Sequence, residues 1–94
     1  MKLPTKVDIA GHSIPIIRVK MVDDTYAQYE HEKRTIFVDI NIKDDRTFIT
    51  SLRHEVLEAS LLLSGVGWSE KYDQEPIVRC VDEIFWPAWE SLKL

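Results

Sequence analysis

Hydrophobic residues follow two different spacings along the chain, and the change falls near residue 44. In residues 7–16, hydrophobic and polar positions alternate on both sides of Ala10-Gly11. Alternation around a short glycine-containing turn is typical of a β-hairpin. The beginning of the chain therefore predicts a hairpin.

A second alternating run follows the polar segment 30–34 (EHEKR). One face of this run is aliphatic and consists of Ile36, Val38, Ile40 and Ile42. The other face consists of Phe37, Asp39 and Asn41. Such alternation favours a strand with one buried face. We expect this strand to form a second hairpin with the residues that precede the polar segment.

From residue 44 onward, hydrophobic residues recur at steps of three and four, which is typical of an amphipathic helix. Asp44 or Asp45 is the expected N-cap, because a carboxylate there accepts backbone N–H groups of the first turn. The expected buried stripe consists of Phe48, Leu52, Val56, Ala59 and Leu63. Ser64-Gly65 is expected to end the helix, since glycine readily adopts the left-handed conformation found there.

A second helix is expected to begin near Glu75-Pro76, because proline fits the first turn of a helix. Its expected buried side chains are Ile77, Val81, Ile84 and Phe85. Pro87 comes too late for that first turn, so we expect a kink or a separate short helix there.

Strands followed by helices predict an α+β fold. We expect one domain over residues 1–94, with strands and hairpins in 1–43 and two helices in 44–94. The sheet is expected to be small and antiparallel, with three or four strands, and to be covered by two antiparallel helices.

The composition of the chain excludes several function classes. The 94 residues include 12 Lys and Arg, 16 Asp and Glu, and one cysteine. Basic residues are scattered among acidic ones, so we expect no nucleic-acid-binding surface. A single thiol and the lack of a long apolar run predict a cytoplasmic protein without a disulfide, a signal peptide or a membrane segment.

Candidate chemistry lies in the first predicted helix, in the segment RHEVLEA at residues 53–59. His54 and Glu58 are four residues apart, so their side chains project from one helix face. Two ligands at this spacing can hold one metal ion, as in the HExxH helix of zinc peptidases. Glu55 lies beside them, where a carboxylate can take a proton from a metal-bound water. We therefore predict that His54 and Glu58 ligate a metal and that Glu55 is a general base.

A third protein ligand is expected from the second helix. If that helix folds back antiparallel to the first, the position opposite the His54–Glu58 pair lies near residue 83. Asp82 is the preferred candidate, and Glu75, on the same helix face, is the alternative. Zinc is the expected metal, and a site with one imidazole and two carboxylates also suits manganese or iron(II).

Two segments, FITSLRHEVLEASLLLSG and EPIVRCVDEIFWPAWESL, resemble short phage and prophage proteins of the zincin type, the minimal gluzincins. They are also similar to the core of ImmA/IrrE-type metallopeptidases. The resemblance spans roughly residues 25–90 and implies metal ligation by His54, catalysis by Glu55 and an acidic ligand at Asp82. The departure is Glu58, which stands where those proteins have a second histidine.

The resemblance implies a metal-dependent peptidase in the cytoplasm, which is the host cytoplasm if the protein is phage-encoded. Its protein or peptide substrate would pair in extended form with an edge strand, for which the Phe37–Ile42 strand is the candidate. The competing hypothesis is a catalytically inactive adaptor with the same fold. Such an adaptor would bind a protein partner through its cleft or its tryptophan-bearing C-terminal helix, and an exposed aromatic patch there would also permit a homodimer.

Simpler interpretations of the same residues stay open. His54 and Glu58 can form an ion pair across one helix turn, and Glu55 can be an exposed acid. Asp82 can form a salt bridge with Arg53 or Arg79. His12 and His31 lie in predicted turns and are expected to be solvated.

Overall fold

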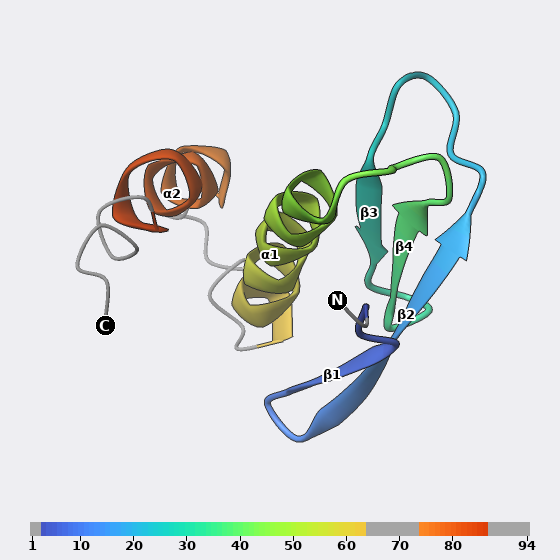
Figure 1. The fold of residues 1–94 in the computed structure, drawn as a ribbon. Helices are drawn as coiled ribbons and strands as arrows, with labels where there is room; N and C mark the ends of the chain where they lie inside the picture. The colour runs from blue at the N-terminus through green and yellow to red at the C-terminus, as the bar shows by residue number, and fades with distance from the viewer. Residues whose placement is uncertain (1–2, 64–73, 87–94) are drawn as a thin grey trace.

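A computed structural model describes residues 3–63 and 74–86 and has an α+β fold. The four strands of its sheet are β1 (Lys6–Ile9), β2 (His12–Val19), β3 (Ala27–Glu30) and β4 (Thr35–Asp39). They are followed by α1 (Asp45–Leu63) and α2 (Gln74–Cys80), which continues into the π-helical turn η2 (Val81–Phe85). Figure 1 shows the sheet, α1 and α2 as three successive layers.

Both predicted hairpins are present. β1 and β2 pair antiparallel around Ala10 and Gly11, whose φ angles are 50° and 81°. Two successive positive φ angles are what a two-residue hairpin turn of type I′ requires. β3 and β4 pair antiparallel around residues 31–34. However, β4 ends at Asp39, and Ile40, which was expected on the buried face, is 56% exposed.

The sheet is mixed, whereas an antiparallel sheet was expected. Its strand order is β1-β2-β4-β3, and β2 and β4 are parallel. The chain passes from β2 to the far edge of the sheet, and the second hairpin then returns β4 to the position beside β2. The turn of a hairpin specifies its own two strands but not which of them docks on the next hairpin. The Phe37–Ile42 strand was therefore wrongly expected at an edge, because β4 has a partner on each side and β3 is the edge strand.

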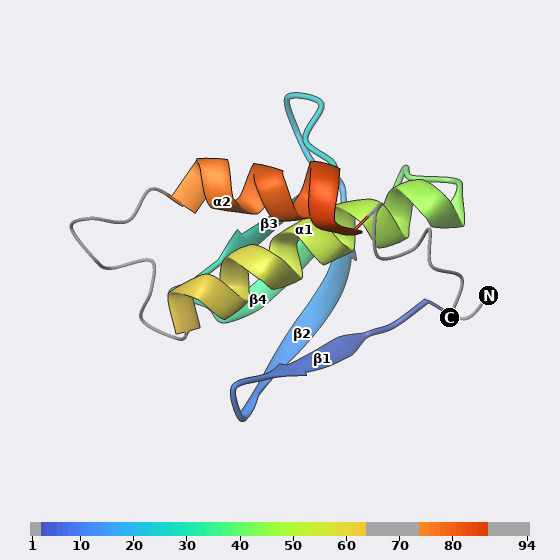
Figure 2. The same ribbon diagram turned by 90° about the vertical axis from the view of Figure 1, so that its left-hand side faces the viewer.

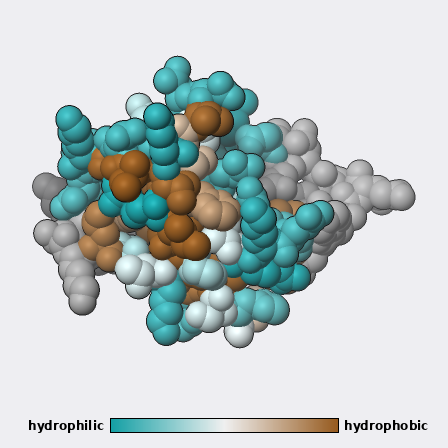
Figure 3. Space-filling view, turned by 90° about the vertical axis from the view of Figure 1, so that its right-hand side faces the viewer, coloured by the Kyte–Doolittle hydropathy of each residue, from teal (hydrophilic) through white to brown (hydrophobic). Residues whose placement is uncertain are grey.

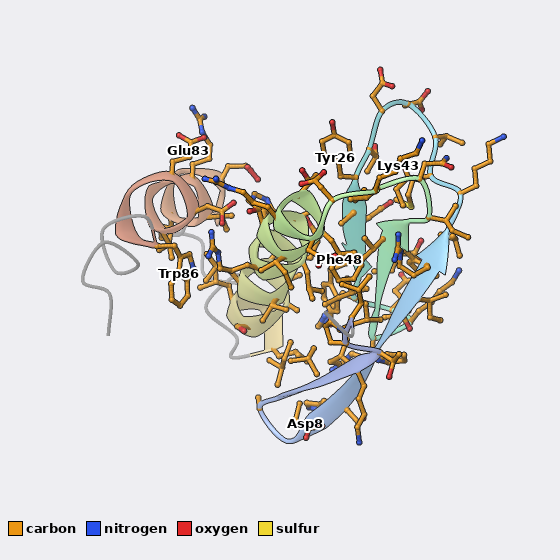
Figure 4. All side chains as sticks on the ribbon, in the orientation of Figure 1. Asp8, Tyr26, Lys43, Phe48, Glu83 and Trp86 are labelled. Carbon is orange, nitrogen blue, oxygen red and sulfur yellow. The ribbon has the colours of Figure 1, made fainter. Side chains whose placement is uncertain are left out.

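Helix α1 covers one face of the sheet, as predicted. The oxygen Oδ2 of Asp44 accepts the backbone N–H of Thr47 at 2.8 Å, which identifies Asp44 as the N-cap. Phe48 lies between α1 and the sheet (Figure 4) and is almost fully buried. The core beneath the helix also includes Ile14, Ile36, Val38, Leu52 and Ala59.

Arg18 holds the segment that leads into α1. Its guanidinium donates hydrogen bonds to the carbonyl groups of Asp39, Ile40 and Ile42 at 3.1–3.3 Å. The same group lies over the Phe48 ring, 4.9 Å from its centre. Arg18 therefore connects the end of β4 to the first turns of α1, and so helps to fix where the helix begins.

Helix α2 packs against α1 and runs in the opposite direction (Figure 2). The predicted antiparallel helix pair is therefore present, but α2 forms a third layer on α1, whereas both helices were expected to cover the sheet (Figure 1). Val78 is fully buried, whereas Ile77, which was expected on the buried side, is 41% exposed. The expected helix end at Ser64-Gly65 and the expected break at Pro87 lie outside the described residues, as do the side chains of Ile84 and Phe85.

The sheet face opposite α1 is partly apolar and open to solvent (Figure 3). A shallow cavity of about 270 Å³ lies on it beside Phe37, Met21 and Val22. Within residues 3–63 and 74–86, neither helix combines the length and apolar character that crossing a membrane requires.

Candidate metal centre

Three potential metal-binding side chains gather on one face of α1. His54, Glu55 and Glu58 each offer one nitrogen or oxygen atom, and these atoms all lie within 4.8 Å of one another. His54 Nε2 is 3.8 Å from Glu58 Oε1 and 3.9 Å from Glu55 Oε2. Two ligands of a tetrahedral zinc ion, each about 2.1 Å from the metal, lie about 3.4 Å apart. The donor atoms are therefore spaced nearly as the ligands of one divalent ion would be.

The position of Glu55 follows from the spacing of the buried residues of α1. These residues are Phe48, Leu52, Glu55 and Ala59, at steps of four, three and four. Such steps keep side chains on one helix face. Glu55 therefore lies in the face that packs on the sheet, whereas the sequence pattern assigned that place to the half-buried Val56. His54 and Glu58 flank it, with side chains that are 30% and 24% exposed.

The carboxylate of Glu55 is bound to the edge strand. Its Oε1 accepts the backbone N–H of Tyr29 on β3 at 2.7 Å, and the residue is only 7% exposed. Its Oε2 lies 3.9 Å from His54 Nε2. One oxygen of Glu55 is thus held by the sheet, and the other is directed to the cluster.

The environment of Glu55 favours its protonated form. Burial raises the pKa of Glu55 from the ordinary 4.5 to about 8, and the nearby charge of Glu58 acts in the same direction. The N–H of Tyr29 and the imidazole of His54 oppose the rise in pKa without cancelling it. In the metal-free protein, Glu55 is therefore a carboxyl group that titrates near neutral pH.

The second helix reaches the cluster through Asp82. Asp82 lies in η2, and its Oδ2 is 2.5 Å from Nδ1 of His54. This is the imidazole nitrogen that does not face Glu55 and Glu58. The other oxygen, Oδ1, is buried and has no hydrogen-bond partner among the described residues. His54 is therefore bracketed by acids, with Asp82 at one nitrogen and the two glutamates at the other.

Opposing effects act on the pKa of His54. Burial alone would lower it, but the hydrogen bond to Asp82 and the charges of Glu55, Asp82 and Glu58 together raise it above the ordinary 6.5. Three carboxyl groups around one imidazole leave the site with excess negative charge whenever the acids are ionised. A bound cation would relieve this repulsion.

A cavity of about 240 Å³ opens next to the cluster. It is lined by Tyr26, Ala27, Thr50, Ser51, His54, Glu55 and Asp82. Strand β3, helix α1 and turn η2 therefore all contribute to its wall. The cavity gives a small molecule or a chain segment access to the edge strand and to the cluster together.

The structure brings four of the five candidate residues together. His54, Glu55 and Glu58 form the donor cluster, and Asp82 meets His54 from the second helix. Glu75 is exposed and does not belong to the cluster. An antiparallel helix pair was expected to place Asp82 opposite the His54–Glu58 pair, and its contact to His54 agrees with that position.

Two residues outside the motif were missed or misjudged. The backbone of Tyr29, which binds Glu55, has no side-chain signal in the sequence, although Glu55 at a buried helix position implies that some donor must meet it. His31 was expected to be solvated, but its Nδ1 lies 2.9 Å from the hydroxyl of Tyr29. His12 is exposed, as expected.

Comparison of the chain with protein-family models, with curated proteins and with solved structures gives no significant match.

Proposed function

We propose that this protein is a metal-dependent hydrolase of zincin type that acts on peptides. His54 Nε2 and Glu58 hold the divalent ion, and Glu55 acts as the general base. The observation that carries the proposal is the cluster itself, in which one imidazole nitrogen and two carboxylate oxygens lie within 4.8 Å of one another. The resemblance of the RHEVLEA helix to minimal gluzincins supports the same assignment.

The two oxygens of Glu55 suit the role of a base. Because Tyr29 holds Oε1, the carboxylate has a fixed orientation, with Oε2 near the metal-binding nitrogen of His54. A base must be ionised at the working pH, and a bound cation beside Glu55 would lower its pKa from the raised metal-free value toward that range. In this role Glu55 would take the proton of a metal-activated water.

The donor set favours a metal that accepts oxygen ligands readily. Replacing the second histidine of HExxH by Glu58 exchanges an imidazole nitrogen for a carboxylate oxygen. Zinc accepts carboxylates, and manganese and iron(II) tolerate an oxygen-rich site better than one with two imidazoles. We therefore propose zinc, manganese or iron(II) as the ion.

Strand β3 supplies a reason to propose an extended peptide as substrate. The carbonyl of Tyr26 accepts the N–H of Asp39, so these two residues form a hydrogen-bonded pair. Bonding alternates along an antiparallel pair of strands. The backbone groups of Ala27 and Tyr29 therefore point away from β4, and that of Tyr29 binds Glu55. Ala27 lines the cavity, where its N–H and carbonyl are placed to pair with an added strand.

A second candidate function is a catalytically inactive adaptor that binds a protein partner in this cleft. The observation that favours it is the Glu55–Tyr29 hydrogen bond. A buried, protonated carboxyl group held by the sheet also stabilises the packing of α1 on β3 without any chemistry.

The two functions differ in the metal content of the protein and in peptide hydrolysis. Purification without chelators, followed by elemental analysis and a cleavage assay on a mixed peptide library, tests both properties. We expect stoichiometric metal and chelator-sensitive cleavage in the wild type and neither in His54→Ala. His12→Ala is the matched control, because His12 is an exposed histidine away from the cluster. The absence of both metal and cleavage from the wild type would contradict the hydrolase and support the adaptor.

A further inference from the structure

We propose that Asp82 is a positioning residue that fixes the proton of neutral His54 on Nδ1, so that the lone pair of Nε2 is directed at the metal. The inference rests on the proposed metal site and changes the role that the sequence suggested for Asp82. It also makes η2, the turn that continues α2, a determinant of metal affinity although η2 donates no ligand.

The distance between Asp82 and His54 fits a hydrogen bond and not a shared ion. Asp82 Oδ2 and His54 Nδ1 are 2.5 Å apart. If both atoms bound one zinc ion, each at about 2.1 Å, they would lie about 3.4 Å apart. A separation of 2.5 Å leaves no room for an ion between the atoms, and it is even shorter than the ~2.7–2.9 Å of most charge-assisted hydrogen bonds from nitrogen to oxygen. Asp82 therefore acts on His54 and not on the ion.

This hydrogen bond decides which nitrogen of neutral His54 carries the proton. Neutral imidazole carries one proton, and the nitrogen that carries it cannot ligate a metal. A carboxylate at Nδ1 accepts an N–H, so it favours the form in which Nε2 is free of a proton. Nε2 is the nitrogen that faces Glu55 and Glu58. Carboxylates that hold metal-binding histidines in this way also make the imidazole a stronger ligand.

The local structure of the second helix directs Asp82 at His54. Asp82 lies in a π-helical turn, and such turns often occur at functional sites because they alter the direction of side chains. Its side chain is 14% exposed, whereas its neighbour Glu83, also in η2, is exposed. Nearby, the guanidinium of Arg53 lies over the ring of Trp86, 5.5 Å from its centre. This contact holds the end of the second helix against α1.

The proton position on His54 can be measured without any metal. Two-dimensional ¹⁵N–¹H NMR of the imidazole, at a pH where His54 is neutral, distinguishes the two tautomers by their nitrogen shifts. We expect the proton on Nδ1 in the wild type and in Glu83→Gln, which removes a neighbouring exposed acid. We expect loss of the pure Nδ1–H form in Asp82→Asn and Asp82→Ala. A wild-type protein with its proton on Nε2 would overturn the inference, whether or not the variants fold.

Metal titration of the same variants separates a positioning role from ligation. With zinc or manganese, Asp82→Asn should keep one ion per chain and bind it about 10–100-fold more weakly, while Glu83→Gln binds like the wild type. Complete loss of stoichiometric binding in folded Asp82→Asn, with the tautomer unchanged, would show that Asp82 is a ligand and overturn the inference. If the wild type binds no metal, the proposed function fails, and the tautomer measurement still tests the role of Asp82.

Discussion

The carboxylate of Glu55 on α1 accepts the backbone N–H of Tyr29 on β3 at 2.7 Å. This hydrogen bond joins the helix that carries the candidate ligands to the edge strand beside the cavity. It satisfies a backbone group that β4 cannot reach, and it orients the acid that we assign as the base. The same contact therefore serves the fold and the proposed chemistry.

Two substitutions at Glu55 separate these roles. The amide oxygen of Glu55→Gln can still accept the Tyr29 N–H but cannot take a proton, so we expect a folded protein without hydrolysis. Glu55→Ala leaves the N–H of Tyr29 without a partner, which should lower the free energy of unfolding by about 1–3 kcal/mol. Urea denaturation and the cleavage assay measure the two effects. Undiminished cleavage by Glu55→Gln would rule out Glu55 as the base, and loss of metal from that variant would make Glu55 a ligand.

The stability of the metal-free protein should fall as the pH rises from about 5 to above 8. Glu55 has its pKa raised to about 8 from 4.5, and the pKa of His54 is raised above 6.5. Between the unfolded and folded values the folded protein holds more protons, so raising the pH favours unfolding, by at most a few kcal/mol. The titratable groups next to Glu55 are His54 and Glu58. Asp82 lies on the other side of the His54 imidazole.

Urea midpoints measured across this pH range test the sign of that dependence. The decline should be shallower in Glu55→Gln, and saturating metal should oppose it, because metal ligands bind in their deprotonated forms. Stability that rises steadily from pH 5 to 8 in the chelator-treated wild type would contradict the raised pKa values.

Glu58→His restores an HExxH sequence and should raise zinc affinity by about tenfold or more relative to manganese, because imidazole suits zinc better than manganese. Glu75→His is the matched control, since Glu75 is exposed and outside the cluster. Competition with a chromophoric chelator measures both affinities. Equal zinc affinity in the wild type and Glu58→His would mean that position 58 does not contact the ion.

The edge-strand hypothesis is tested by proline substitutions on β3. Ala27→Pro removes an N–H that points away from β4, so it should reduce peptide cleavage while the melting temperature changes little. Gln28→Pro is the contrasting variant, because Gln28 forms the next hydrogen-bonded pair with Phe37. Losing that ladder bond should lower the melting temperature clearly. Unimpaired cleavage by folded Ala27→Pro would exclude substrate pairing at Ala27.

Local signals predicted the elements of this fold well. The turn at Ala10-Gly11, the cap at Asp44 and the aliphatic face of β4 each depend on residues close together in the chain. The order of the strands was not predictable in the same way. It depends on which strand of the second hairpin packs beside β2, and the turn between β3 and β4 does not specify this.

In the candidate site, too, local spacing predicted some features, whereas others depend on the tertiary structure. The spacing of His54 and Glu58 placed both on one helix face. The expected antiparallel helix pair placed Asp82 opposite them along the second helix, where it contacts His54. Which imidazole nitrogen Asp82 meets depends on the π-helical turn at Val81–Phe85, for which the sequence gives no periodic signal. The burial of Glu55 was detectable in principle from its place between Leu52 and Ala59, but a charged residue is seldom assigned to a core stripe.

The most direct test of the central claim is an anomalous difference map from crystals soaked in zinc or manganese. We predict a peak bonded to Nε2 of His54 and to a carboxylate oxygen of Glu58, with Asp82 still hydrogen-bonded to Nδ1. A map without a peak at this cluster, from crystals in which the metal is bound elsewhere, would contradict the account.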